Sequence, residues 1–536
     1  MRPRTAIVLA AIAAASIGML DSTTSAAGTD DQAIVHVLNR LGFGPRPGDV
    51  DKVRQIGIER YVEQQLHPER LPDADVTRRL AGLTTLTMSS REIVERYGKP
   101  LLDARRQRQQ QPPPDRAETE PARRPAASGE QQAANTPLAE LSQQKMLRAI
   151  YSERQLEEVL ADFWFNHFNV DARKGPDRFL LTEYEREAIR PHVLGPFRDL
   201  LEATAKSPAM LFYLDNWMSA DPKSEDRRAQ GSQRRVGRGR APFGGPGAGR
   251  PTTPTGQPQG QAANPRRGLN ENYGRELMEL HTLGVDGGYT QKDVTEVARA
   301  FTGWTIDNPR QGGGFRFEPR LHDSGEKTVL GHRIKSGGGM SDGERVLDIL
   351  ATHPSTARFL STKLARRFVS DTPPASLVDR LAARFTATEG DLREVMRTLL
   401  TSPEFLAPES YSAKVKTPLE FVVSAVRATG AEPRDTRGLV ATMRELGMPL
   451  YQCQPPTGYK DTADAWVNTG ALVNRMNFAQ TLAGVPSAAG RGAARETPDP
   501  LLGLRVSETT RATIAKATGA PQAMALTLGS PEFQRR

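Results

Sequence analysis

Cysteine is almost absent from this chain of 536 residues, in which Cys453 is the single thiol. One thiol excludes an intramolecular disulfide, a four-cysteine zinc site and a cysteine-bound iron–sulfur cluster. Haem attachment through Cys-x-x-Cys-His is excluded for the same reason. Stability must therefore come from packing, and hydrophobic residues, at 37% of the chain, suffice for one or two globular domains.

Several catalytic signatures are also missing. A Gly-x-Ser-x-Gly pattern occurs once, at residues 339–343, but no predicted strand ends directly before it, as a nucleophile elbow requires. The sequence has no Walker-type phosphate loop and no Gly-x-Gly-x-x-Gly after a strand. These absences argue against an ordinary serine esterase and against a nucleotide-binding enzyme. The helical zinc signature His-Glu-x-x-His is missing too. The cofactor is left unknown, with a divalent metal as one option.

Long apolar runs are missing beyond the first thirty residues. Residues 1–27 are typical of an export signal, because Arg2 and Arg4 precede an alanine-rich apolar run and Ser25–Ala27 offers small residues for cleavage near Ala27. We predict a protein that is periplasmic or secreted, with no stable membrane span after signal cleavage. An uncleaved N-terminal anchor is the alternative.

Charge is distributed unevenly along the chain, whose formal net charge is +9. Residues 221–268 alone carry ten Lys or Arg against three Asp or Glu, in a stretch rich in Arg, Gly and Pro that we predict to be disordered. Such a segment is able to bind nucleic acid or acidic polymers. Phe243 is its lone aromatic residue, so we predict a solvated linker and no nucleic-acid partner.

A second low-complexity insert, rich in Arg, Gln and Pro, covers residues 105–137. The two inserts divide the chain after the signal into an N-terminal helical part, 28–104, and two core parts, 138–220 and 269–536. We predict that these parts form one large, mainly α, multi-helix globular domain with a short β-hairpin.

Helical periodicity covers most of the sequence outside the inserts. The predicted helices are 49–66, 89–104, 138–152, 154–169, 177–190, 270–283, 290–303, 342–351, 355–369, 375–387, 391–401, 418–429, 436–445 and 470–484. Strand signals are few. The clearest are 315–317 and 328–330, which flank a polar loop and predict the hairpin.

One carboxylate in the predicted helix 270–283 occupies a position expected to be apolar. Glu276 projects between Leu280 and Leu283 in an apolar stripe, and Asn272 lies at the edge of that stripe. Burying an unpaired carboxylate is costly, so Glu276 should have a partner or a raised pKa. Glu276 is therefore our first catalytic candidate.

A histidine occupies a similar position in the predicted helix 154–169. His167 lies in the stripe formed by residues such as Leu160 and Phe163, where burial should lower its pKa unless a carboxylate faces it. If the two helices face each other, His167 and Glu276 form a hydrogen-bonded pair. That pair is either an acid–base dyad or a contact that only fixes helix register.

Three further polar residues are candidates for binding. His281 borders the stripe of the helix that carries Glu276, and His322 and Asp323 begin the polar loop between the two predicted strands. Together with His167 and Glu276 they are of the types that bind zinc or iron, although their spacing does not show that they converge. A solvated turn is the alternative for the loop.

The segment from Gln452 to Gly470 combines prolines, glycines and aromatic residues in a non-helical connection. Its aromatic and amide groups either line a pocket or hold the last helices against the core. Cys453 has no obvious base beside it, so we do not expect it to act as a nucleophile.

Taken in order, short motifs in this chain resemble those of the bacterial family catalogued as domain of unknown function 1800. The matching segments are 36–44, 164–168, 189–192, 270–284, 300–304, 322–327, 455–466 and 468–475. One departure is Tyr459, where members often carry Gly-Trp after paired prolines. The resemblance implies an exported, largely helical bacterial protein and implies no reaction. Members are frequently encoded beside an exported phosphatase- or sulfatase-like protein, which is a candidate partner.

Two functions are predicted from these observations. The first is an envelope or extracellular hydrolase-like enzyme that uses a buried polar site, with Glu276 and His167 in the catalytic roles. The alternative is a non-catalytic envelope protein that binds or matures a partner such as the phosphatase/sulfatase-like neighbour.

Overall fold

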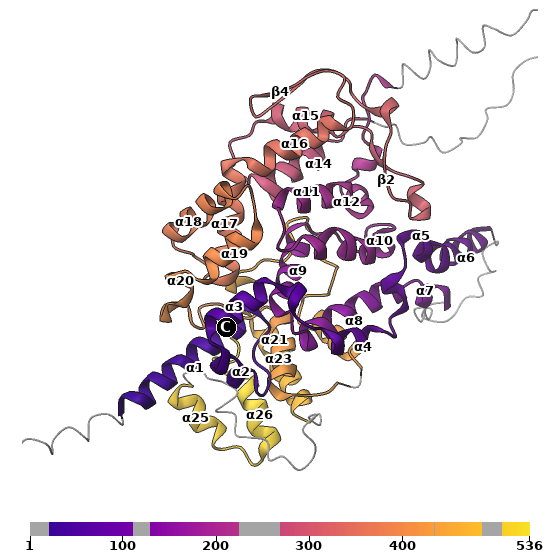
Figure 1. Ribbon diagram of the computed structural model, residues 1–536. Helices are drawn as coiled ribbons and strands as arrows, with labels where there is room; N and C mark the ends of the chain where they lie inside the picture. The colour runs from indigo at the N-terminus through magenta and orange to yellow at the C-terminus, as the bar shows by residue number, and fades with distance from the viewer. Residues whose placement is uncertain (1–20, 111–128, 225–267, 434, 485–505) are drawn as a thin grey trace, which may run out of the picture.

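The computed structural model describes residues 21–110, 129–224, 268–433, 435–484 and 506–536, and these form a mainly α structure (Figure 1). The first helices are α1 (Asp21–Leu41), α2 (Asp49–Ile56), α3 (Ile58–Leu66), α4 (Ala74–Leu80), α5 (Ser90–Ile93), α6 (Lys99–Gln110), α7 (Gly129–Ala133), α8 (Thr136–Tyr151), α9 (Gln155–His167), α10 (Asp177–Glu183), α11 (Phe197–Lys206) and α12 (Pro208–Tyr213). Two predicted segments lie largely outside the described residues. These are residues 1–20 of the predicted export signal 1–27 and residues 225–267 of the predicted basic insert 221–268.

The second half of the chain continues as helices interrupted by four short strands. Its elements are α14 (Glu271–Glu276), α15 (Gln291–Ala300), β1 (Trp304–Ile306), β2 (Phe315–Phe317), β3 (Lys327–Val329), β4 (His332–Ile334), α16 (Ser341–Thr352), α17 (Pro354–Phe368), α18 (Ala375–Ala387), α19 (Leu392–Leu400), α20 (Pro403–Leu406), α21 (Pro418–Thr429), α22 (Arg437–Glu445), α23 (Thr469–Ala483), α25 (Glu508–Ile514) and α26 (Ala520–Leu528). The prediction of a mainly α protein is confirmed.

The predicted strand pairing is wrong, although both predicted strands exist. β2 pairs antiparallel with β1, and Trp304 lies opposite Phe317. β3 pairs antiparallel with β4, and Lys327 lies opposite Ile334. The preference of each strand for its neighbour in sequence explains the error, because short connections favour adjacent antiparallel strands. The described residues thus contain two small sheets in place of one hairpin.

Three helices change from α to π geometry, in which one extra residue is accommodated in a turn. The π-helical segments are η3 (Val94–Gly98), η4 (Tyr184–Ile189) and η7 (Leu277–Thr282). The η4 segment continues α10, and η7 continues α14, so the predicted helices 177–190 and 270–283 each contain a change of register. Side chains after such a change no longer follow the 3.6-residue spacing used to predict their faces.

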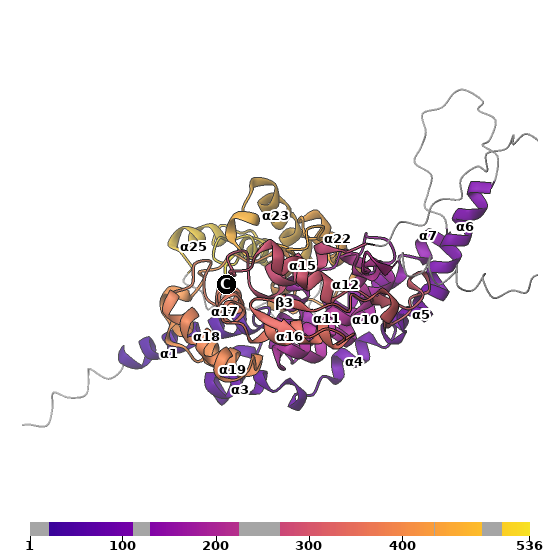
Figure 2. The same cartoon turned by 90° about the horizontal axis from the view of Figure 1, so that it is seen from above.

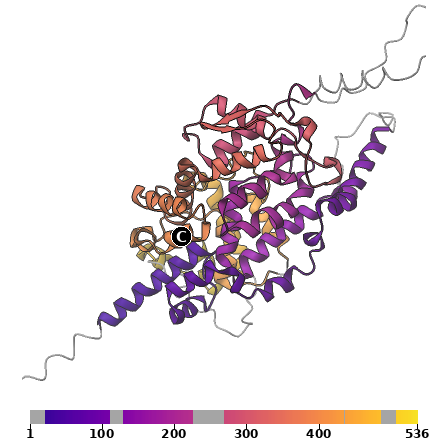
Figure 3. The same ribbon diagram turned by 45° about the horizontal axis from the view of Figure 1, so that its top comes forward.

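The core centres on α9 and α21, whose side chains are largely buried. α9 contacts α1, α3, α8 and η4, while η7 contacts α16 and α17. Seen from above, α6 and α7 project away from the body (Figure 2). The tilted view shows α1 and α6 extending in opposite directions (Figure 3). Helix α6 extends into the predicted insert 105–137 from one side, and α7 and the start of α8 extend into it from the other.

In the parts of the chain that the structure describes, no helix combines the length and apolar character needed to cross a bilayer.

Candidate functional site

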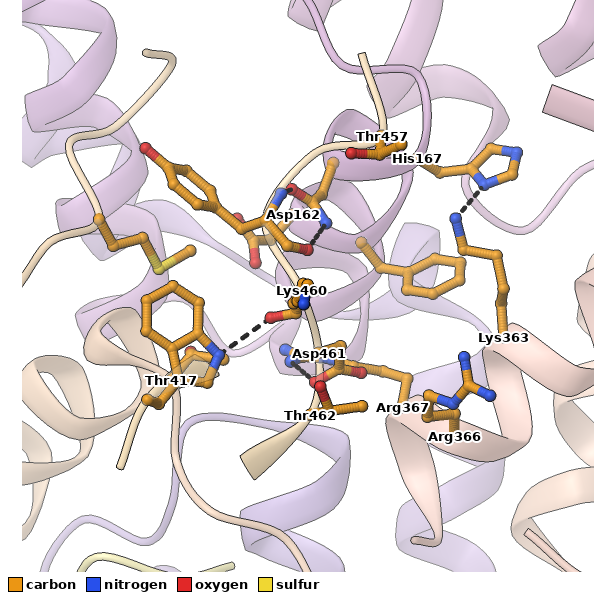
Figure 4. A pocket seen from close by; sticks show the side chains of 15 residues that line it. Asp162, His167, Lys363, Arg366, Arg367, Thr417, Thr457, Lys460, Asp461 and Thr462 are labelled. Atoms are coloured by element: carbon orange, nitrogen blue, oxygen red, sulfur yellow. Dashed lines mark hydrogen bonds and ion pairs between the residues drawn. The ribbon is translucent and has the colours of Figure 1, made fainter. Parts of the chain in front are cut away.

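A cavity of about 340 Å³ opens where the C-terminal end of α9 meets α17 and residues 457–466 (Figure 4). His167 on α9 and Lys363 on α17 lie at one side of it, and we call it the His167 cavity. Two of the segments that resemble the family, 164–168 and 455–466, therefore contribute to the same walls.

The hydrogen bonds of His167 fix its tautomer. Its Nε2 lies 3.1 Å from the main-chain oxygen of His281, and a carbonyl only accepts, so Nε2 carries the hydrogen. Burial lowers the pKa of His167 well below its usual value, and nearby Lys363 lowers this pKa further. The ring is therefore neutral and its Nδ1 is an acceptor. Lys363 Nζ, 2.8 Å from Nδ1, donates to it (Figure 4).

Lys363 is a half-buried cation that lacks an acidic partner. Burial lowers the pKa of Lys363 to about 8, and the more distant Asp461 opposes this only in part. Within the described chain, His167 Nδ1 is the side-chain group that accepts from Nζ, and no carboxylate forms an ion pair with it. A protonated Lys363 has two further N–H groups to offer to a ligand.

The acidic residues of the cavity are already engaged by other cations. Asp162 accepts from Lys145 at 2.9 Å. Asp461 lies 3.4 Å from Lys414 and 3.6 Å from Arg367, whose main partner is Glu420. These pairs leave the charge of Lys363 without compensation.

Two other cavity cations are also free to meet a ligand. Arg366, one helical turn from Lys363, donates its Nε to the main-chain oxygen of Asp371 at 3.2 Å. Lys460 is exposed and lies 3.9 Å from Asp464, a distance at which an exposed pair contributes little. Lys363, Arg366 and Lys460 thus give the cavity an excess of positive charge.

The connection between α22 and α23 is held rigidly against the cavity. Asn166 Nδ2 donates to the oxygen of Tyr459 at 2.8 Å, and the Tyr459 amide donates back to Asn166 at 2.7 Å. Gly458, with φ of 72°, passes so close that an added Cβ would lie 2.3 Å from the main-chain oxygen of Asn166. Trp466 Nε1 donates to the oxygen of Lys460 at 2.9 Å. This segment both lines the pocket and contacts the core, so the two predicted alternatives coexist.

The predicted pair of His167 and Glu276 is not formed. Both ring nitrogens of His167 are engaged, by Lys363 and by the oxygen of His281. Glu276 is half-buried at the end of α14, where burial and Glu279 raise its pKa. The raised pKa agrees with the prediction, but its cause is not a histidine partner. Asn272 is exposed on the same helix.

The change of register at η7 explains why the predicted faces were shifted. The apolar stripe predicted for residues 270–283 assumes α-helical spacing throughout, whereas the π turn begins at Leu277. His281, predicted at the border of the stripe, is 2% exposed, and its ring centre lies 6.3 Å from that of His167. Burial lowers the pKa of His281 to about 3, with a further contribution from Lys363. The histidines converge, and Glu276 remains apart from them.

His322 and Asp323 belong to a different, enclosed cluster. His322 Nε2 lies 3.1 Å from Asp342 Oδ2, and its Nδ1 lies 2.8 Å from the oxygen of Thr302. Asp323 forms an ion pair with Arg299 at 2.7 Å. The five candidate metal-binding residues are thus not brought together. Across the described ranges, no group of three or more His, Cys, Asp or Glu is arranged to hold a metal ion.

The sequence reasoning missed Lys363 and Arg367, although a signal was present. In the predicted helix 355–369, both follow Leu360 at the i+3 and i+7 positions of the stripe that also contains Leu364. A cation at such a position is as unusual as the carboxylate at 276.

The molecule is thus a mainly α protein with a basic cavity built between central helices and an ordered connection. A family model described as "Protein of unknown function (DUF1800)" matches residues 36–535, nearly the whole chain. The chain belongs to this family, as its motifs predicted. Searches of curated proteins and of solved structures give no significant match.

Proposed function

We propose that the His167 cavity binds the oxyanion group of a ligand, such as a carboxylate, phosphate or sulfate, and that Lys363 is the acid–base residue beside it. The observation that carries this proposal is the half-buried ammonium group of Lys363, which has no acidic partner and lies at the wall of a cavity. A buried charge is stabilised by pairing, so the cavity is suited to a ligand that brings the missing negative charge.

The chemistry of Lys363 supports an acid–base role. A lysine with a pKa of about 8 is present in both protonation states near neutral pH, which is the range in which general acid–base catalysis is efficient. Neutral His167 positions Nζ through Nδ1 and is itself fixed by the oxygen of His281. Within this proposal, His167 is a positioning residue, and Glu276 has no role in proton transfer.

We extend the proposal to an exported hydrolase-like enzyme. The predicted export signal in residues 1–27 supports the location, and the polar cavity with its titratable lysine supports the reaction class. A protein that binds or matures a phosphatase/sulfatase-like partner stays a prediction from the family resemblance.

Anion titrations test the binding proposal. Sulfate, phosphate and malonate would be titrated calorimetrically into the wild type, Lys363→Met and Lys335→Met, where Lys335 is an exposed lysine after β4. At least one anion is expected to bind the wild type and Lys335→Met equally, and to bind Lys363→Met about tenfold to a hundredfold more weakly, because a charge-assisted contact is lost. Equal binding by all three proteins, or binding by none, would refute the proposal.

A further inference from the structure

The His167 cavity is larger than a single oxyanion group requires. Its volume of about 340 Å³ lies near the lower end of the range of about 300–1,000 Å³ that is typical of small-molecule sites. Lys363 and Arg366 lie together at one side of it (Figure 4). An oxyanion bound by these two cations fills only part of the space, so the other walls indicate what else the ligand contains.

The cationic side of the cavity has several free donors. Arg366 uses its Nε for the main-chain oxygen of Asp371, and in the part of the chain that the structure describes its two Nη atoms donate to no protein group. Lys363 lies one turn earlier on α17 and donates to His167 Nδ1. Because a guanidinium and an ammonium group on the same helix face can share one anion, this side is suited to hold the charged end of a ligand.

Two other polar groups of the cavity are free to bind hydroxyl groups. Asp162 pairs with Lys145 through Oδ1 at 2.9 Å, and no donor among the described residues is bonded to its Oδ2. Thr457 is exposed, and its hydroxyl lies 3.5 Å from the oxygen of Gly458, which is longer than a normal O–H···O bond. Since Lys145 already balances the charge of Asp162, Oδ2 is better suited to accept from a neutral O–H group than from a second cation.

The free carboxylate oxygen and the cationic side are separated along α9. Asp162 and His167 are five positions apart on this helix, which places their backbones about 7.5 Å apart along its axis. His167 in turn holds Lys363. A ligand that reaches both groups therefore carries its hydroxyl groups about one ring away from its oxyanion.

Aromatic side chains complete the walls between these groups. Phe163, Tyr459 and Trp466 line the cavity, and the ring centres of Tyr459 and Trp466 lie 6.1 Å apart at an angle of 55°. The face of an aromatic ring is slightly negative and packs well against C–H groups. One face of a sugar ring presents such C–H groups while its hydroxyl groups point outward around the ring. The walls therefore offer a surface for the ring of the ligand as well as for its polar groups.

We propose that the ligand of the His167 cavity is a sugar that carries an oxyanion group, such as a uronic acid or a sugar phosphate. This inference rests on the proposed binding of an oxyanion by Lys363. The oxyanion contacts Lys363 and Arg366, a ring hydroxyl donates to Asp162 Oδ2, and the ring packs against the aromatic walls. An aromatic acid without hydroxyl groups fits less well, because it would cover Asp162 Oδ2 without supplying a donor, and an unmatched carboxylate oxygen is costly to desolvate.

Calorimetric titration of matched ligand pairs tests the proposal. Glucuronate would be compared with cyclohexanecarboxylate, and glucose 1-phosphate with cyclohexyl phosphate, since the members of each pair share a charge and a six-membered ring and differ in hydroxyl groups. In at least one pair the sugar is expected to bind the wild type about tenfold or more tightly than its counterpart, and more tightly than uncharged glucose. The pair that shows the preference identifies the oxyanion as a carboxylate or a phosphate.

The outcomes separate this inference from the oxyanion proposal on which it rests. If the hydroxyl-free anions bind as tightly as the sugars and lose affinity in Lys363→Met, the sugar is refuted while oxyanion binding stands. If none of the four anions binds, and sulfate does not bind either, both proposals are refuted.

Substitution of Asp162 tests the hydroxyl contact. Asp162→Asn is expected to bind the preferred sugar about fivefold to tenfold more weakly, with no change for its hydroxyl-free counterpart, because the charged acceptor for the hydroxyl is lost. Asp215→Asn is the matched control, since Asp215 pairs with Lys174 at 2.8 Å and does not line the cavity. Equal losses for the sugar and its counterpart, or unchanged sugar binding, would contradict the contact.

A pair of substitutions at Tyr459 tests the packing of the ring without relying on Asp162. Tyr459→Phe and Tyr459→Leu both remove the hydroxyl that donates to the oxygen of Pro449 at 2.8 Å, so that loss of stability is common to the two variants. Tyr459→Phe keeps the aromatic face and should bind the preferred sugar like the wild type, whereas Tyr459→Leu should bind it about threefold to tenfold more weakly. Equal sugar affinity in the two variants would contradict packing of the sugar on this wall.

Discussion

Two lysines of this protein, each beside a histidine, have opposite surroundings. Lys327 has no exposed side-chain surface, and its Nζ contacts Asp342 at 2.7 Å and the main-chain oxygens of Asp323 and Gly325. All three of its N–H groups are used. Lys363 contacts one neutral acceptor, His167 Nδ1, and faces a cavity. The first lysine has its charge balanced within the fold, whereas the second retains the capacity to bind a ligand.

This difference indicates how a polar residue that stabilises the fold can be distinguished from one that binds a ligand. Residue type alone does not distinguish the sites, since each combines a lysine with a nearby histidine. The difference lies in whether the protein itself supplies the counter-charge. The Lys327 cluster should therefore contribute to stability, and the His167 cavity should contribute to binding.

Acid should destabilise the protein through its buried histidines. Burial holds the pKa of His281 at about 3 and that of His167 well below 6.5, so the unfolded state binds protons that the folded state does not. Lowering the pH below 6.5 therefore lowers the free energy of unfolding by about 1.4 kcal/mol per pH unit for each such histidine, or about 3 kcal/mol for His281 at pH 4.5. Urea unfolding as a function of pH measures this slope. His281→Phe should reduce this slope by about a third, because His36, whose pKa burial also lowers to about 3, titrates on unfolding in the same range. An unchanged slope would show that His281 does not titrate on unfolding.

Lys327→Met should be the most damaging of the lysine substitutions at neutral pH. It leaves Asp342 buried with His322 as its remaining side-chain partner, and breaking a buried ion pair from one side costs about 3–5 kcal/mol. Urea unfolding measures the loss. Adding Asp342→Leu to Lys327→Met should restore most of the stability, because both charges are then removed. A single variant as stable as the wild type would contradict the proposed role of the cluster.

The same substitution at Lys363 should leave the fold nearly unchanged. Lys363→Met removes a partly desolvated charge that has no acidic partner but leaves His167 Nδ1 without its donor, and these effects oppose each other. We expect the free energy of unfolding to change by less than about 1 kcal/mol. Comparing Lys363→Met with Lys327→Met in one urea series measures the difference directly. Equal losses of stability in the two variants would contradict the proposed difference between the His167 cavity and the Lys327 cluster.

Glu276→Gln should have the smallest effect. Glu276 is half-buried, and its pKa is raised by burial and by Glu279, so a neutral amide relieves a small repulsion. The expected change in the free energy of unfolding is within about 0.5 kcal/mol, with unchanged anion affinity. Thermal unfolding and calorimetric titration check both values. Loss of anion binding in this variant would show that Glu276 belongs to the anion-binding site.

Most of the fold was predictable because its helices have strong apolar periodicity. The predicted ranges 355–369 and 375–387 agree with α17 and α18 to within one residue at each end. The change to π geometry at Leu277 was not predictable from the same pattern, since the extra residue alters the spacing on which the pattern depends. The face of His281, which follows Leu277, was misjudged for that reason.

The candidate site was predicted in part. Burial of His167 followed from its position among apolar residues, and the ordered connection before α23 was placed beside a pocket as one alternative. The partner of His167 was not predicted, because Lys363 lies 196 positions away and pairs of distant helices cannot be inferred from periodicity. Its place on the apolar stripe of the predicted helix 355–369 was the available signal.

The pH dependence of sulfate binding tests the central claim most directly, because sulfate keeps its charge while Lys363 loses its own. The claim predicts that wild-type affinity falls by up to about tenfold per pH unit as the pH rises above about 8, since protonated Lys363 is the binding form. Lys363→Arg should bind sulfate with an affinity that stays flat from pH 7 to about 9.5, because arginine remains charged there. Sulfate affinity that does not change with pH in the wild type, or that falls equally in Lys363→Arg, would contradict the assignment of Lys363 as the anion-binding group of the cavity.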